Sequence, residues 1–310
     1  ASHLYTKEFF EMVSDRLESD GVFVQWIGLG FVDTNLLRSL VATLADTFEH
    51  LLVISPGASV GRASMAFVAS NEPLSLLETA PRAIEMIGDD LARVGVHSKE
   101  DIAAALVLDN QAARQFSSES QLISDDHNLL AWAASRVGED WALKQPIAEA
   151  IAPYDVLPDI PDDFDTDLLA RRLAQRKALP RAKSLIDTLA EPAKSSALGW
   201  VALDNGRTHA AIQRFQRALK QDPNHAGAAA GLALADPARA NLENLPPETR
   251  VLLTGRSFLI ENDWLALLEL DELLATWPPG SLLYPEAARL RITWRLIEGS
   301  PSRAEEALAI

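Results

Sequence analysis

Gln25 is the residue whose setting in the sequence most strongly suggests a binding role. It lies in the stretch 21–30, where the apolar run Val22–Val24 is followed by Gln25, Trp26 and glycines at 28 and 30. This pattern predicts a buried parallel strand whose carboxyl end opens into a loop. Because open α/β sheets bind ligands just outside the carboxyl ends of their strands, we expect Gln25 to line a substrate pocket.

A second group of chemically active residues, Ser124, Asp125, Asp126 and His127, stands side by side in the sequence. Two carboxylates beside an imidazole could serve catalysis or hold a metal ion. The same residues could equally begin a helix, with Ser124 or Asp125 as its cap and Asp126 complementing the helix dipole. We favour the cap, and so we expect neither a catalytic residue nor a metal site in this chain.

Other chemistries are excluded by composition. The chain has no cysteine, which rules out disulfides, thiolate nucleophiles and iron–sulfur clusters. The six histidines lack metal-binding spacing, and no Gly-x-Ser-x-Gly motif is present. A formal charge of −16 argues against nucleic acid as a partner. We find no apolar run long enough to span a membrane and no signal peptide, and we expect a cytoplasmic location.

The elements that would position Gln25 follow from hydrophobic periodicity. The pattern predicts a helix over 2–19, a strand over 22–27, a helix over 35–48 and strands over 51–55 and 63–70. The loop joining the last two strands is too short for a parallel crossover, so we expect an antiparallel hairpin. Residues 74–137 are predicted to be helical throughout, including 101–116. The order resembles the C-terminal part of a Rossmann-like, methyltransferase-type sheet.

The C-terminal half of the sequence is predicted to be wholly helical. Residues 152–167 contain three prolines and six aspartates, which indicates a linker rather than a metal site. Beyond it, residues 192–225 have the spacing of a tetratricopeptide repeat, carried by Leu198, Gly199, Gly206, Ala211, Phe215, Ala218 and Pro223. Weaker pairs are expected over 166–190, split at Pro180, and over 247–276 and 285–309.

We therefore divide the chain into four parts. Residues 1–73 form the α/β part, 74–150 a helical extension, 151–165 an acidic, proline-rich linker, and 166–310 an all-α domain of tetratricopeptide-like repeats. One repeat cannot bury its own apolar face, so several must stack. A stack of this kind commonly offers a concave surface to a protein partner.

The first 70 residues resemble the C-terminal half of the catalytic domain of spermidine synthases, the polyamine aminopropyltransferases. The resemblance lies in the run Leu4–Phe10, in Leu17, Asp20, Gly21 and Val22, in Gln25 at the end of its strand, and in the strand Ala63–Ser70. The segment Leu122–Asn128 is similar to a Thr-Asp-Asp block of divergent members. Those members are often fused to a membrane domain or to tetratricopeptide repeats.

The resemblance implies an activity for a longer parent protein. Such enzymes transfer an aminopropyl group from decarboxylated S-adenosylmethionine, their co-substrate, to a diamine such as putrescine. By match of position, Gln25 and Tyr5 would bind the substrate. The family's glycine-rich nucleotide loop, ribose-binding acid and catalytic aspartate have no counterpart in these residues, and the acidic residue expected soon after Gln25 is absent.

We therefore expect the upstream half of the sheet to precede Ala1, and this chain alone to be inactive and to hold no cofactor. Two alternatives remain open: a fragment of an S-adenosylmethionine-dependent methyltransferase, which shares the order of elements, and a helical-repeat scaffold for protein interaction.

Overall fold

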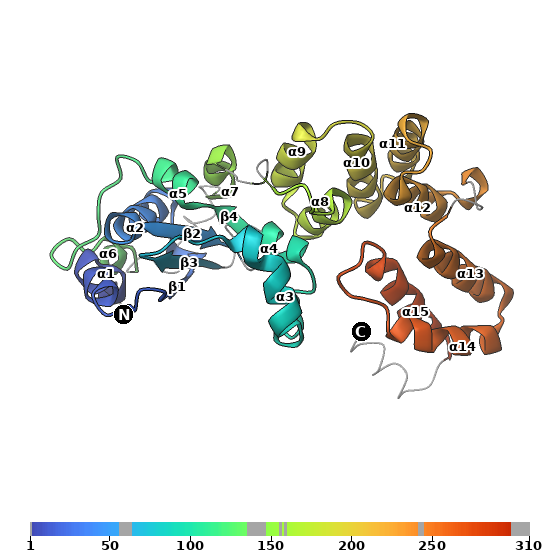
Figure 1. The fold of residues 1–310 in the computed structure, drawn as a ribbon, viewed down its shortest axis with the longest axis horizontal. Coiled ribbons are helices and arrows are strands. Elements are labelled where there is room, and N and C mark those ends of the chain that lie inside the picture. The colour runs from blue at the N-terminus through green and yellow to red at the C-terminus, as the bar shows by residue number, and fades with distance from the viewer. Residues whose placement is uncertain are drawn as a thin grey trace. The chain divides into compact units, whose positions relative to one another are not determined.

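The computed structural model describes residues 2–55, 64–134, 147–154, 157, 160–240 and 245–298. The chain forms two compact units. The first, here called the α/β unit, comprises Ala1–Met86, Lys99–Phe164 and Gln175–Leu185. The second, the helical unit, comprises Ile87–Ser98, Asp165–Ala174 and Ile186–Ile310. Figure 1 shows the elements of both units in chain order.

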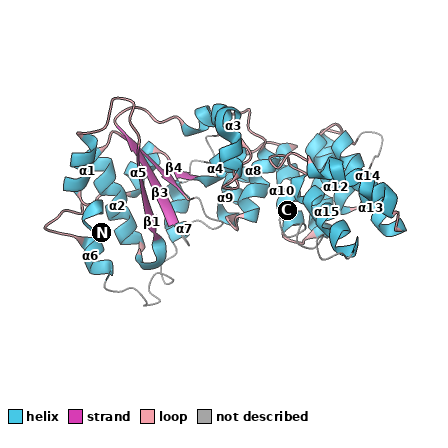
Figure 2. Cartoon of the chain, turned by 90° about the horizontal axis from the view of Figure 1, so that it is seen from below, coloured by secondary structure: helices cyan, strands magenta, loops and turns pink. Residues whose placement is uncertain are grey.

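The α/β unit is built on a four-stranded antiparallel sheet (Figure 2). Its strands are β1 (Phe23–Gly28), β2 (His50–Ile54), β3 (Ser64–Ser70) and β4 (Leu106–Leu108), in the order β1-β3-β2-β4. Since β3 is antiparallel to both of its neighbours, β1 and β2 run in the same direction. The predicted antiparallel pairing of 51–55 with 63–70 is confirmed.

Two helices of the α/β unit, α2 and α5, begin at aspartate caps. The carboxylate of Asp33 accepts a hydrogen bond from the Leu36 amide at 2.7 Å and so starts α2, and Asp109 starts α5 in the same way. The helices are η1 (Ser2–Tyr5), α1 (Lys7–Ser14), η2 (Leu29–Phe31), α2 (Thr34–Thr47), α3 (Leu76–Ala92, which continues into the helical unit), α4 (Lys99–Ala105), α5 (Asn110–Phe116), α6 (Leu129–Ala134), α7 (Ile147–Ile151), η4 (Ala152–Tyr154) and α9 (Leu179–Thr188).

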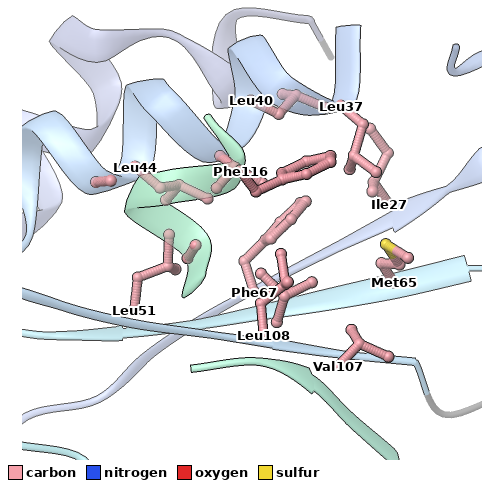
Figure 3. Close-up of a cluster of buried hydrophobic side chains, with 14 of the residues drawn as sticks. Ile27, Leu37, Leu40, Leu44, Leu51, Met65, Phe67, Val107, Leu108 and Phe116 are labelled. Carbon is pink, nitrogen blue, oxygen red and sulfur yellow. The ribbon is translucent and has the colours of Figure 1, made fainter. Parts of the chain in front are cut away.

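The core of the α/β unit lies between α2 and one face of the sheet. Figure 3 shows Leu37, Leu40 and Leu44 of α2 directed toward Phe67 of β3 and Phe116 of α5. The phenylalanines and Leu40 are completely buried. Since burial of each large apolar side chain contributes about 1.5–3 kcal/mol, this cluster holds the helix against the strands.

Two of the expected elements are wrong. β1 is not a buried parallel strand: it pairs antiparallel with β3, and Val24 and Trp26 are 58% and 60% exposed, while Ile27 points into the core. This alternation is that of a strand with one face in water. The helix expected over 101–116 is interrupted by β4, because the short apolar run Leu106–Leu108 pairs with β2 before Asp109 begins a new helix.

The described part of the helical unit is built of helices. They are α8 (Thr166–Gln175), α10 (Ala193–Asp204), α11 (Thr208–Gln221), α12 (Ala226–Ala235), η6 (Pro237–Arg239), α13 (Pro247–Glu261), α14 (Trp264–Ala275) and α15 (Tyr284–Glu298). Helix pairs are therefore confirmed within 192–225 and 247–276. Two helices, α8 and α9, are also present within 166–190, but the break between them lies at 176–178 and Pro180 is the second residue of α9. Residues 299–310 of the last expected pair lie outside the described part. The tetratricopeptide assignment stays a prediction.

A buried cation ties distant helices of this unit together. Arg171 of α8 is 1% exposed and forms two hydrogen bonds with Asp204 of α10, at 2.8 and 3.0 Å. It forms two more with Glu286 of α15, at 3.0 and 3.1 Å, and lies over the Trp200 ring. Two carboxylates and an aromatic face together offset the desolvation of one guanidinium.

Candidate functional site

The two residues predicted to bind substrate meet at the carboxyl end of β1. The Tyr5 hydroxyl donates a hydrogen bond to the Trp26 carbonyl at 2.8 Å. The Gln25 side-chain amide donates to the same oxygen at 3.2 Å. A phenol and an amide thus converge on one backbone carbonyl, although twenty residues separate them in the sequence.

Aromatic packing fixes this arrangement. Phe9 and Phe10 of α1 contact Phe23 at the start of β1, with ring centroids 6.3 and 6.0 Å apart, and Phe23 stacks on Phe48 at 5.8 Å. Since η1 leads directly into α1, the position of α1 against β1 also sets the position of Tyr5. The spacing of apolar residues in 2–19 therefore serves to position the phenol.

The Tyr5 hydroxyl is a donor at neutral pH. Burial raises its pKa above 10.0, and the neighbouring Gln25 side chain only partly opposes this. The phenol therefore keeps its proton and cannot serve as a base near neutrality. Its role at this site is to orient groups by hydrogen bonding.

The segment around Asp125 lies against the same η1–α1 corner. The Lys7 amide donates to the Ile123 carbonyl at 2.8 Å, and the Asp125 amide donates to the Glu8 carboxylate at 3.0 Å. The Asp125 carboxylate lies 3.3 Å from His3 Nδ1, and hydrogen bonding from Thr6 and His3 lowers its pKa. Asp125 thus carries a negative charge beside His3 and Thr6.

The helix cap expected at Ser124 or Asp125 is instead Asn128, which follows them by four and three residues. Asn128 begins α6 by accepting a hydrogen bond from the Ala131 amide at 2.9 Å. Ser124 accepts from the His127 amide and closes a turn just before it. Because Asn128 caps α6, Asp125 is free to bond back to η1.

The polar groups of this corner are a phenol, an amide and the carboxylates of Glu8 and Asp125. In the described ranges, no three histidine or acidic side chains come together in a way that could hold a metal ion. Nor does any helix among those residues have the length and apolar character needed to cross a membrane.

Sequence reasoning did not single out Arg38. This residue is the one basic side chain in α2, on a helix dominated by leucine, alanine and threonine. It lines a hollow of about 540 Å³ beside the first turns of α2. A lone cation among apolar residues was the signal available in the sequence.

Comparison with family models, curated proteins and solved structures returned no match. Any functional assignment therefore depends on the residues and the geometry described above.

Proposed function

We propose that the α/β unit forms the acceptor-binding part of a spermidine-synthase-like transferase, with Gln25 and Tyr5 in contact with an amine substrate. The observation that carries the proposal is the meeting of these two side chains at the carboxyl end of β1. α/β enzymes bind ligands at the carboxyl ends of parallel strands, and β1 and β2 run in the same direction although β3 lies antiparallel between them. The negative charge of Asp125, which contacts His3 of the neighbouring η1, supports a cationic acceptor.

The order of the strands supports the same proposal. β1 is followed by α2 and by β2 in the same direction, and β3 then enters between them with the opposite direction. This arrangement resembles the C-terminal end of a methyltransferase-type sheet. A methyltransferase shares that order, so the chemistry of the acceptor has to separate the two activities.

In the proposed role these residues position the acceptor and do not activate it. The side-chain oxygens of Gln25 and Tyr5 would accept hydrogen bonds from one ammonium group of a diamine, and Asp125 would attract its charge. Positioning of this kind is a large part of catalysis when two substrates must meet. The 310 residues contain no glycine-rich nucleotide loop, so they do not fit decarboxylated S-adenosylmethionine, and we derive no step through it.

Binding of putrescine, followed by nuclear magnetic resonance, tests the proposal. We expect putrescine to shift the signals of the Gln25 side-chain amide and the Trp26 indole. We expect 1,4-butanediol, which has the same length without charge, to leave them in place. Gln25→Ala should weaken putrescine binding about tenfold, equivalent to one lost hydrogen bond to a charged group. Met12→Ala, on the exposed side of α1, is the control.

Equal shifts with putrescine and butanediol would contradict amine recognition. Tight binding of methylthioadenosine to this chain would show that it holds the nucleoside after all, and would overturn the assignment to the acceptor side alone.

A second function, protein interaction, is favoured by the surface of the helical unit. Leu265 and Ile260 are 76% and 81% exposed, and Leu268 and Leu273 of α14 are about half exposed. Exposed apolar side chains gathered on neighbouring helices mark interaction surfaces. We propose that α13 and α14 bind a protein partner, as expected for a repeat domain.

Affinity capture with the full chain tests this second proposal. Leu265→Glu should abolish recovery of the partner without lowering the melting temperature, since the side chain is exposed. Arg217→Glu, a charge change on α11, is the control. A partner recovered equally by both variants would place the binding surface elsewhere.

A further inference from the structure

The hollow beside α2 contains an arginine without a partner. Arg38 lines it together with Asp33, Ser39, Glu119 and Trp132. Among the described residues, no ion pair or hydrogen bond engages its guanidinium, and its Nε atom is buried without a partner. Buried donors are nearly always satisfied in folded proteins, so an unpaired one requires an explanation.

Arg38 is held in place by an aromatic ring. Its guanidinium carbon lies 5.1 Å from the centroid of Phe116, which is completely buried. A cation over an aromatic face is stabilised by roughly 0.5–2 kcal/mol without using its N–H groups. The donors of Arg38 therefore remain available in a fixed orientation.

The two carboxylates that line the hollow form no ion pair with Arg38 among the described contacts. Asp33 lines the same hollow, but its carboxylate caps α2 by accepting from the Leu36 amide. Glu119 also lines the hollow, and no ion pair with Arg38 is formed by either residue. Two other arginines of this unit donate to backbone carbonyls: Arg114 to three that include Ala45, and Arg181 to two.

We infer that this hollow binds a small organic anion whose carboxylate or phosphate group pairs with Arg38. The flat guanidinium presents adjacent N–H groups that match two oxygens of such a group. The space of about 540 Å³ suits a metabolite-sized molecule. Leu129 and the exposed ring of Trp132 would contact its apolar body.

This anion site is independent of the proposed amine site. Arg38 has the opposite charge preference from Asp125, and none of the residues lining the hollow belongs to the Tyr5–Gln25 corner. Putrescine binding and anion binding can therefore fail separately, and each experiment tests one proposal.

Calorimetric titration of the full chain with benzoate and with phenyl phosphate tests the inference. We expect at least one of these anions to bind, and we expect neutral benzamide, of nearly the same shape as benzoate, not to bind. The better of the two anions identifies the group that the site prefers. Arg38→Gln should weaken binding tenfold or more, whereas Arg38→Lys, which keeps the charge but loses the fork, should weaken it less.

Arg16→Gln is the matched control, because Arg16 is an exposed arginine of the same unit and its loss changes the net charge equally. It should leave anion affinity unchanged. A shift of the Arg38 Nε–H resonance in the wild-type chain on addition of the anion provides a readout that requires no variant. Three results would each overturn the inference. They are failure of both anions to bind, binding of benzamide as strong as that of benzoate, and unchanged anion affinity in a folded Arg38→Gln variant.

Discussion

At the scale of single residues, Asp167 of α8 is the most perturbed acid. It is 5% exposed, and Ser196 donates a hydrogen bond to its Oδ2 at 2.6 Å. Its other carboxylate oxygen has no partner among the described residues. Burial raises the pKa of this carboxyl from 3.8 to about 7, which places its titration close to neutral pH.

The raised pKa predicts that alkaline conditions destabilise the helical unit. Between pH 3.8 and about 7 the folded chain holds a proton that the unfolded chain has lost. The free energy of unfolding therefore falls as the pH rises through this window, and the loss is complete above it. Asp167→Asn removes the titrating group and should remove this slope. At a pH of roughly 8 the variant should be more stable by about 2–4 kcal/mol.

Urea unfolding at roughly pH 5 and pH 8 measures this difference. Asp89→Asn, an exposed position on α3, is the control and should keep the slope of the wild-type chain. An unchanged slope in Asp167→Asn would show that another group causes the pH dependence.

The candidate site was only partly predictable from individual residues. Tyr5 and Gln25 were selected by their match of position with spermidine synthases, and the structure brings their side chains together, while their role in binding stays a prediction. The contacts of Asp125 with His3 and Glu8 span 122 and 117 residues, and no local pattern records them. Arg38 was not predicted as a site residue. Its interest comes from the absence of an ion-pair or hydrogen-bond partner among the described residues, and a sequence does not show which side chains meet.

At the scale of elements, three helices enclose one phenylalanine. Phe215 of α11 is completely buried and meets Trp200 edge to face, with ring centroids 5.4 Å apart. Gly199 of α10 and Gly231 of α12 approach its ring so closely that a Cβ atom would lie 2.4 and 2.2 Å from it. The glycines are therefore required by helix packing and not by backbone conformation.

This packing predicts that Gly231→Ala destabilises the helical unit by about 1–3 kcal/mol, because the added methyl group forces Phe215 out of its position. Gly88→Ala is the matched control: Gly88 is also helical, and no atom lies within 4 Å of a Cβ built there. It should be neutral or slightly stabilising, since alanine favours helices over glycine. Chemical denaturation compares the two, and a neutral Gly231→Ala would contradict the packing argument.

Hydrophobic periodicity predicted most helices and the β2–β3 pair, because these elements carry repeated apolar positions. It missed β4, since three apolar residues show no period that separates strand from helix. It also assigned β1 to the sheet interior, because Val22 and Val24 read as buried although they face outward. Whether one face of a strand is exposed depends on whether another element packs against that face, and the apolar residues of the strand alone do not show this.

At the scale of the whole molecule, the two units are interleaved along the chain. The boundaries expected at residues 73, 150 and 165 follow changes in composition. The α/β unit nevertheless includes Gln175–Leu185, and the helical unit includes Ile87–Ser98. Composition describes neighbours in sequence, whereas a compact unit is defined by neighbours in space.

The ion pairs of Arg171 join residues that the ribosome synthesises at different times. Glu286 follows Arg171 by 115 residues, so the ribosome, at about 5–20 residues per second, supplies this second carboxylate roughly 6–23 s later. During that interval Arg171 can be joined by Asp204 but not by α15. A chain that stops before α15 would leave the Arg171 guanidinium with Asp204 as its acidic partner and without Glu286.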